Sequence, residues 1–351
     1  MRPNSGVVLV SGGAGYIGSH VAQVLRNSGY TPVVIDNLVN GNLWATRVAS
    51  TFRQGDIGDA AFIRAVCDEF APVAALHFAA FIEVGESVRQ PERYFTNNRD
   101  KAKVFFDTLV GKGVKNIVFS STAAVYGDVT DSAAIREDHP TRPVNPYGQS
   151  KLDAETYLRT IGSVKSVALR YFNVAGAEPA AGLGEAHFPE SHVIPRIVLP
   201  LIDTPLELQS ALGLGGGFKI FGTDYPTRDG TAVRDYVHVM DLADAHVRAL
   251  RYLFDGGATS IFNVGSGSGY SVNEIVDAAR KTLARPDFEP GKEPRRPGDT
   301  ATLIADSARA KEVLGWAPQR GVESMIGSAA QWHRSQTYTD TIVRKAKAAT
   351  V

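Results

Sequence analysis

Continuous apolar runs alternate with helix-like stretches along the first half of the chain. Residues 7–10 (VVLV) are all aliphatic, and the apolar positions that follow at 17, 21, 24 and 25 repeat with the period of an α-helix. A second aliphatic run at residues 32–35 ends at Asp36. Because these runs are apolar throughout rather than alternating, they predict strands of a parallel sheet that is buried on both faces.

The same alternation continues toward the middle of the chain. Further strands are expected near residues 52–54, 73–78, 116–120 and 167–171, with helix-patterned stretches between them. Repeated strand–helix units of this kind predict an α/β fold with a doubly wound, mostly parallel sheet.

The second half of the chain has a different composition and a less regular pattern of apolar residues. Glycine, proline and alanine crowd residues 175–190, yet strands at 237–239 and 261–264 flank a predicted helix at 241–254. We therefore expect a nucleotide-binding domain at residues 1–176, and we expect residues from about 234 to 264 to return to this domain. An interleaved, smaller α/β substrate domain should cover 177–334, and 335–351 should be a tail, either a frayed helix or a disordered end.

The amino-acid composition limits the classes of partner that the protein is expected to bind. The 351 residues are 44% hydrophobic and 21% charged, as in globular proteins. Lysine plus arginine and aspartate plus glutamate both number 37, so the net charge is zero and nucleic acid is not an expected partner. No apolar run approaches the roughly 20 residues of a membrane span, and no signal peptide is evident. The single cysteine, Cys67, forms no internal disulfide, which fits the cytoplasm.

A glycine-rich turn follows the first strand. Gly12, Gly15 and Gly18 are spaced three apart, and Gly13, Gly15 and Gly18 also satisfy G-x-G-x-x-G. Such glycines let the backbone approach a pyrophosphate at the N-terminus of the following helix. Asp36, about 20 residues on, is placed to bind a ribose diol and to repel a 2′-phosphate. Glycines can also simply make a turn, but this context favours a Rossmann-type site for NAD over NADP.

A second constellation lies at residues 120–151. Ser120, Ser121 and Thr122 follow a predicted strand, at the sheet edge where ligands bind. Tyr147 and Lys151 are four residues apart on one helix face. Nearby positive charge, from the Lys151 ammonium and the oxidised nicotinamide, should lower the pKa of the Tyr147 phenol and make it a usable base near neutral pH.

These motifs resemble the extended short-chain dehydrogenases/reductases, and more closely the UDP-glucose 4-epimerases. The likeness runs from about residue 7 to 332 and includes GGAGYIGSH, HFAA, NPYGQSK, LRYFNVAGA, FGTDYPTRDGTAVRDYVHVMDLADAH and PRRPGD. The resemblance implies that NAD stays bound while UDP-glucose and UDP-galactose are interconverted. C4 would be oxidised to a 4-keto intermediate, which rotates and is reduced again on its other face.

The resemblance also implies roles for individual residues. Tyr147 would be the base, Thr122 would hydrogen-bond the reacting oxygen, and Lys151 would hold the nicotinamide ribose. The NAD site would include Gly12, Gly15, Tyr16, Ile17, Gly18, Asp36, Asn37, Asn40, Asp56, Ile57, Phe78, Ala79, Ala80, Asn98, Tyr147, Lys151 and Phe172. The UDP-sugar site would include Thr122, Asn173, His192, Phe221, Arg234, Arg296, Asp299 and Leu303.

Three positions depart from the family pattern. Thr122 replaces a more common serine, and Ile82 stands where some members have a lysine near the phosphates. His192 stands where the family usually has asparagine. Leu303, at a position that limits the sugar pocket, is intermediate in size, and it favours plain hexoses over N-acetylated sugars.

Several alternatives stay open at this stage. UDP-xylose/UDP-arabinose epimerisation, or dual hexose and pentose specificity, is the nearest, because one sugar carbon changes binding by only ~1–3 kcal/mol. A dehydratase is disfavoured by Ala123 and Ala124, which stand where carboxylic groups would be needed. A non-catalytic NAD-binding protein is a remote possibility.

The last expectations concern metal binding, the oligomeric state and the metabolic pathway. Glu185, His187, Glu190 and His192 are close in sequence, but their spacing matches neither a zinc helix nor a calcium loop, so no metal is expected. Family members are commonly homodimers, and we expect one through helices of the first domain. The pathway, galactose catabolism or supply of polysaccharide precursors, is not readable.

Overall fold

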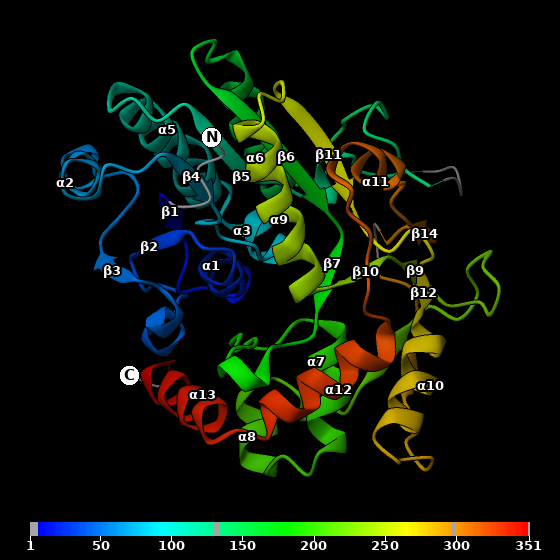
Figure 1. Ribbon diagram of the computed structural model, residues 1–351. Helices are drawn as coiled ribbons and strands as arrows, with labels where there is room; N and C mark the ends of the chain where they lie inside the picture. The colour runs from blue at the N-terminus through cyan, green and yellow to red at the C-terminus, as the bar shows by residue number, and fades with distance from the viewer. Residues whose placement is uncertain (1–5, 130–133, 297–298, 350–351) are drawn as a thin grey trace.

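A seven-stranded parallel sheet forms the centre of the N-terminal part of the molecule. The computed structural model describes residues 6–129, 134–296 and 299–349. The strand order is β11-β6-β5-β4-β1-β2-β3, and each neighbouring pair is parallel (Figure 1). The predicted fold class is confirmed. The strands are β1 (Val7–Ser11), β2 (Thr31–Asp36), β3 (Thr51–Gln54), β4 (Ala74–His77), β5 (Asn116–Ser120), β6 (Lys165–Tyr171) and β11 (Ser260–Val264).

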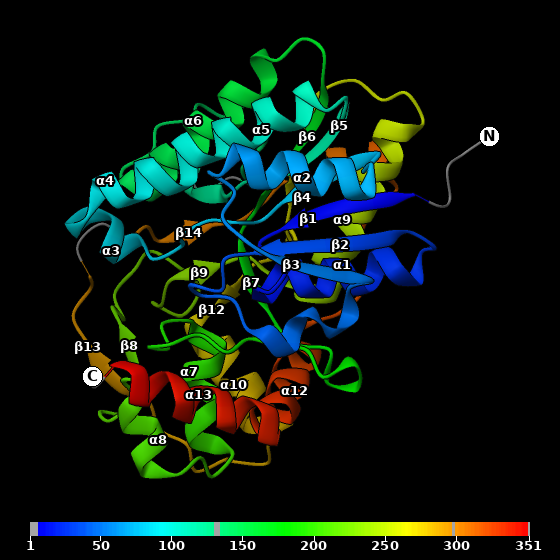
Figure 2. The same ribbon diagram turned by 90° about the vertical axis from the view of Figure 1, so that its left-hand side faces the viewer.

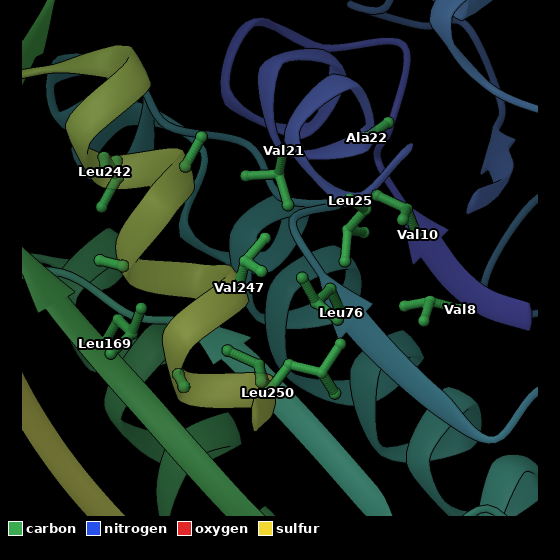
Figure 3. Packing of buried hydrophobic residues seen from close by; sticks show 14 of the residues in the cluster. Val8, Val10, Val21, Ala22, Leu25, Leu76, Leu169, Leu242, Val247 and Leu250 are labelled. Carbon is green, nitrogen blue, oxygen red and sulfur yellow. The ribbon is translucent and has the colours of Figure 1, made fainter. Parts of the chain in front are cut away.

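Helices cover both faces of this sheet, which explains why its strands are apolar throughout (Figure 2). Val8 and Val10 face α1 and α9, and they pack there with Val21 and Leu250 (Figure 3). Leu9 lies between them in sequence and faces α2, α5 and α6 on the other side. The covering helices are α1 (Tyr16–Asn27) and α9 (Val239–Phe254) on one face, and α2 (Ala60–Phe70), α5 (Lys101–Gly111) and α6 (Pro146–Thr160) on the other.

A second hydrophobic core lies below the sheet in Figure 1 and is mainly helical. Ile197, Ile275, Ile326 and Trp332 are almost wholly buried in it. Its helices are α7 (Val193–Leu201), α8 (Leu206–Ala211), α10 (Val272–Thr282), α12 (Val322–His333) and α13 (Gln336–Ala349). Short strands beside it are β7 (Asn173–Ala175), β8 (Lys219–Phe221), β9 (Val233–Arg234), β10 (Tyr236–His238), β12 (Tyr270–Ser271), β13 (Gly291–Glu293) and β14 (Thr302–Leu303).

The remaining short elements lie in the connections between these helices and strands. The α-helices are α3 (Val84–Arg89), α4 (Pro91–Tyr94) and α11 (Ala308–Leu314). Phe95–Asp100 form a π-helical turn, η2, between α4 and α5. The 3₁₀ turns are η1 (Leu43–Val48), η3 (Ala123–Val125) and η4 (Pro179–Ala181).

The rejoining segment differs from the prediction at its start. α9 and β11 do return to the main sheet, where β11 pairs with β6. Residues 233–238 do not, because β9 pairs with β12 and β14 while β10 pairs with β7. The helix predicted at 241–254 begins two residues earlier, at Val239, where the His238 side chain accepts a hydrogen bond from the N–H of Met240.

The prediction that the C-terminal tail is a frayed helix or a disordered end is wrong. Residues 336–349 form helix α13, and the last two residues of the chain lie outside the described part. Tyr338 and Ile342, four residues apart, are fully buried on one face of this helix. The Lys345 ammonium donates a hydrogen bond of 2.8 Å to the carbonyl of Ala186. Among the described residues, no helix is both long enough and apolar enough to cross a membrane.

Candidate active site

A cavity of about 390 Å³ lies at the carboxyl edge of the main sheet, and the turn from β1 to α1 forms one end of it. Gly12 has φ +72°, and a Cβ there would lie 2.5 Å from the backbone nitrogen of Ala79. At Gly18 a Cβ would lie 2.4 Å from the carbonyl oxygen of Gly12. No side chain caps α1. The backbone therefore comes close to the cavity and presents first-turn N–H groups, as an anion site requires.

Asp36 lies at the end of β2, in the wall of the same cavity. Its Oδ2 accepts the N–H of Ala14 at 3.1 Å, and its Oδ1 accepts the N–H of Leu38 at 2.8 Å. Burial raises the pKa of Asp36, and these two hydrogen bonds lower it in part. The carboxylate is thus held rigidly beside the glycine turn, where it can accept further hydrogen bonds from a ribose.

Thr122, Tyr147 and Lys151 meet at the other end of the cavity. Thr122 caps the turn η3, where its Oγ1 accepts the N–H of Ala124 at 3.1 Å. Tyr147 and Lys151 lie one turn apart in α6, and the hydroxyl of Thr122 is hydrogen-bonded to the phenol of Tyr147. Asn145 caps α6 through the N–H of Gly148 at 2.8 Å. Two independent caps therefore fix the two hydroxyl groups relative to each other.

The charge balance at this end corrects one expectation. Burial raises the pKa of Tyr147, which the hydrogen bond with Thr122 lowers only in part. Burial also lowers the pKa of Lys151 to about 7, and its ammonium lies 4.3 Å above the Phe119 ring. Lys151 was expected to lower the pKa of Tyr147. This is wrong for the chain on its own, because the interior disfavours charge on both groups.

The hydroxyl triplet is also used differently from the prediction. Ser120 lines the cavity and is hydrogen-bonded to the phenol of Tyr171. Ser121 points into the protein, where its Oγ donates to Oε2 of Glu155 at 2.7 Å. Of the three residues, only Ser120 and Thr122 therefore lie where they could meet a ligand.

Most residues predicted for NAD lie in the wall of this one cavity, but Asp56 and Asn98 do not. Asp56 accepts hydrogen bonds from Asn37 and Lys101, and Asn98 holds both backbone groups of Phe81. Both therefore support the wall from behind. The predicted residues in the wall are Gly12, Gly15, Tyr16, Ile17, Gly18, Asp36, Asn37, Asn40, Ile57, Phe78, Ala79, Ala80, Tyr147, Lys151 and Phe172.

The residues predicted for the UDP-sugar fall into two groups. Asn173 and His192, like Thr122, line the cavity. Phe221, Arg234, Arg296, Asp299 and Leu303 do not line it and instead form a neighbouring cluster on β8, β9, β14 and the segment before β14.

Contacts within this neighbouring cluster hold its charges together. The Arg296 guanidinium lies 5.0 Å from the Phe221 ring centre and pairs with Asp299 at 2.9 Å. Burial lowers the pKa of Arg234, which Asp299 raises in part. Leu303 is paired with Arg234 across β14 and β9, and it packs against the cluster of buried residues that contains Phe172.

The sequence analysis missed several residues in the wall. Tyr171 follows the same rule as the predicted residues, because it ends β6 at the carboxyl edge of the sheet, so strand ends could have revealed it. Trp44 carries no such signal, and Ile82 was noted only as a departure from the family pattern. Glu185 and His187 also line the cavity. The sequence analysis noted both of them, but only for metal spacing.

The segment that carries His192 is dense in ionisable groups. Nδ1 of His192 lies 2.6 Å from Oε1 of Glu185. Burial lowers the pKa of His192, but Glu185 and Glu190 raise it more, so it lies well above its ordinary value. His187, Glu190 and His192 each bring one ligand atom within 4.8 Å of the others. Their sequence spacing gave no hint of this convergence.

Together these features fit NAD. Gly12 leaves a space that any Cβ would fill, an uncapped helix N-terminus faces a diphosphate position, and a carboxylate stands where a ribose diol would lie. The cofactor's redox-active ring would then lie toward Thr122, Tyr147 and Lys151.

Comparison with known proteins agrees with this geometry. Residues 8–265 match the NAD dependent epimerase/dehydratase family. A UDP-glucose 4-epimerase from Rhizobium meliloti (strain 1021) is 46% identical over 329 residues, which cover 93% of this chain and 96% of that one.

Two solved structures are also similar. UDP-glucose 4-epimerase from Brucella ovis in complex with NAD has a TM-score of 0.86 and 41% identity, covering 93% of this chain and 97% of that one. UDP-glucose-4-epimerase from Stenotrophomonas maltophila, with bound NAD and formylated UDP-arabinopyranose, has a TM-score of 0.85 and 37% identity, covering 95% and 99%. The chain therefore belongs to the NAD dependent epimerase/dehydratase family, and within it to the family of UDP-glucose 4-epimerases.

Proposed function

We propose that this protein is an NAD-dependent isomerase that interconverts UDP-glucose and UDP-galactose by inverting C4 of the sugar. Its relatives share this activity by name, over nearly the whole chain. The observation that carries the proposal is the convergence of Thr122, Tyr147 and Lys151 in the wall of a cavity whose other end fits a dinucleotide. A hydroxyl-linked phenol at this place can exchange a proton with a sugar hydroxyl.

Each of the three residues has a distinct task in this proposal. When bound, NAD supplies the redox centre that oxidises C4 and later reduces it. Tyr147 accepts the proton of the 4-hydroxyl through its phenol oxygen and returns it after the sugar has turned. Thr122 orients the reacting oxygen. Lys151 binds the nicotinamide ribose, and in its protonated form it places positive charge near Tyr147.

The UDP-sugar is proposed to extend from this centre to the neighbouring cluster. Asn173 and His192 line the route, and Leu303 connects Phe172 in the cavity wall to the cluster. A guanidinium fork suits phosphate oxygens, so Arg234 and Arg296 are proposed to bind the diphosphate. Phe221 and Asp299, which contact Arg296, would complete the uridine end. In this arrangement the segment 177–334 acts as the substrate domain.

We further propose a cytoplasmic homodimer that acts in galactose metabolism. The one cysteine, Cys67, is a buried free thiol, which suits a reducing compartment. Helices α5 and α6 lie together on the outside of the sheet, and Val104 on α5 is 36% exposed. Light scattering during gel filtration would report the mass of the assembly, and Val104→Glu should shift it toward the monomer if these helices form the interface.

The activity is tested with the purified protein and no added NAD. UDP-glucose, UDP-galactose, UDP-N-acetylglucosamine and UDP-xylose are incubated separately, and each C4 epimer is quantified. We expect rapid exchange of the two hexoses. Tyr147→Phe should lose at least ~10²-fold in rate while it keeps its NAD, since general base catalysis contributes about that much. Tyr157→Phe, on the same helix but outside the cavity wall, loses only a hydrogen bond to Asp107 and should keep full activity.

The other results would identify an alternative. Faster turnover of UDP-xylose than of the hexoses would favour the pentose epimerase, which the UDP-arabinopyranose derivative in the Stenotrophomonas structure makes worth testing. Bound NAD with no epimer from any sugar would indicate a non-catalytic NAD-binding protein. A Tyr147→Phe variant with near-normal rate would overturn the assignment of the base.

A further inference from the structure

A cluster of imidazoles and carboxylates lies in the segment before α7, at the edge of the cavity. One ligand atom from each of His187, Glu190 and His192 lies within 4.8 Å of the others. Glu190 is only 2% exposed, and its Oε1 accepts the backbone N–H of His192 at 2.8 Å. This hydrogen bond holds the carboxylate beside both imidazoles, with Oε1 3.6 Å from Nδ1 of His192 and 3.9 Å from Nδ1 of His187. The two ring centres are 5.0 Å apart.

Three buried atoms in this cluster have no hydrogen-bond partner, namely Nδ1 of His187, Oε2 of Glu190 and Nδ1 of His192. Nε2 of His187 lies 3.0 Å from Oε1 of Glu83, so the ring proton belongs on Nε2 and the lone pair on Nδ1. Nδ1 of His187 and Oε2 of Glu190 are therefore electron-pair donors. Buried acceptors without a donor are rare in proteins and costly.

The carboxylates around the cluster outnumber its imidazoles. Three carboxylates, Glu83, Glu185 and Glu190, face the two imidazoles. The nearest basic side chains bind backbone oxygens instead, since Lys345 donates to Ala186 and Arg196 donates to Glu190. Buried carboxylates are retained where they are paired or coordinate a metal.

We propose that His187, Glu190 and His192 bind a Zn²⁺-class transition-metal ion. Two imidazoles and a carboxylate are a typical zinc ligand set. Glu185, whose Oε1 lies 2.6 Å from Nδ1 of His192, is placed to supply the fourth ligand. Glu83 holds the far nitrogen of His187, as carboxylates behind zinc-bound histidines commonly do.

Four protein ligands make this a structural site rather than a catalytic one. Glu83 precedes α3, whereas the ligands precede α7, so the metal would tie these two distant segments of the cavity wall together. The proposal does not rest on the epimerase activity, because metal content can be measured without any sugar substrate.

The test uses full-length protein without a histidine tag. The protein is stripped with a chelator, loaded with zinc sulfate, desalted and analysed for metal by mass spectrometry. We expect about one zinc per chain in the wild type, and below about a tenth in His187→Gln and Glu190→Gln, as ligand loss predicts. His139→Gln is the matched control, because it removes a histidine that lies edge-on to Tyr126 and outside the cluster. This variant should bind zinc like the wild type.

A second measurement does not depend on the variants. Cobalt loaded into the wild type should give the strong visible absorption of a tetrahedral site, and zinc should raise the thermal midpoint. If the wild type retains no more zinc than Glu190→Gln, or if neither the cobalt spectrum nor the midpoint responds, the proposal is wrong. Equal zinc in all four proteins would show adventitious binding only and would also overturn it.

Discussion

Glu155 and Arg170 form a two-pronged ion pair that fixes the helix of the active site to the sheet. Nη2 of Arg170 lies 2.6 Å from Oε1 of Glu155, and its Nε lies 3.1 Å from Oε2. Both side chains are almost wholly buried. Ser121 donates to the same carboxylate at 2.7 Å. Since Glu155 lies one turn beyond Lys151 in α6, this pair sets the position of the catalytic face of that helix.

Glu155→Gln should therefore destabilise the protein strongly. The variant leaves Arg170 buried with its charge unpaired, a change that typically costs ~3–5 kcal/mol of unfolding free energy. Urea unfolding measures the difference. Glu69→Gln breaks the exposed ion pair with Arg53 and should cost less than about 1 kcal/mol. Equal losses in the two variants would show that the buried pair has no special weight.

The buried Lys151 should make stability depend on pH. Burial lowers its pKa to about 7 in the folded chain, while an unfolded lysine titrates near pH ~10.4. Between these values the unfolded state binds more protons, so the unfolding free energy rises with pH, and the full penalty is present below about pH 7.

Lys151→Met removes this dependence. Compared with the wild type, the cofactor-free variant should gain most stability near pH 6, and the gain should shrink steadily toward pH 10. Urea unfolding of both proteins across this range gives the curve. A gain that is the same at every pH would mean that Lys151 has an ordinary pKa in the folded state.

Thr122 should control the pH at which the enzyme becomes active. Its hydrogen bond lowers the pKa of Tyr147, which burial raises. Thr122→Val removes the bond, so the pKa of Tyr147 should rise and the ascending limb of the kcat/KM profile should move to higher pH. Thr122→Ser keeps the hydroxyl and should leave the limb in place. If both variants shift the profile equally, the hydroxyl is not what tunes the base.

Local patterns predicted the sheet, the glycine turn and Asp36, whereas most other residues of the dinucleotide wall were predicted by resemblance. The apolar strand runs indicated the parallel sheet, and the carboxyl edge of such a sheet brings together residues as distant as Gly12 and Tyr147. The chemistry of Lys151 could not be read in this way, because its pKa depends on burial in the folded protein.

Contacts between distant segments also could not be predicted from the sequence. The pairing of His187 with Glu83 joins residues more than a hundred positions apart, and no periodic pattern marks it. The arginine cluster of Arg234 and Arg296 was predicted by resemblance, but its place beside the cavity rather than in its wall follows from the pairing of β9 with β14. Tertiary packing decides both arrangements.

Helix α13 should contribute to stability, although its sequence is polar overall. Tyr338 and Ile342 are fully buried in the second core, where the Tyr338 ring lies 6.3 Å from that of Trp332. Ile342→Ala should cost ~2–5 kcal/mol of unfolding free energy, because it leaves a cavity between α13 and its neighbours. Val343, the next residue, is 39% exposed, so Val343→Ala should cost less than about 1 kcal/mol. Urea unfolding distinguishes the two cases, and a small effect in both variants would mean that the end of the chain is frayed after all.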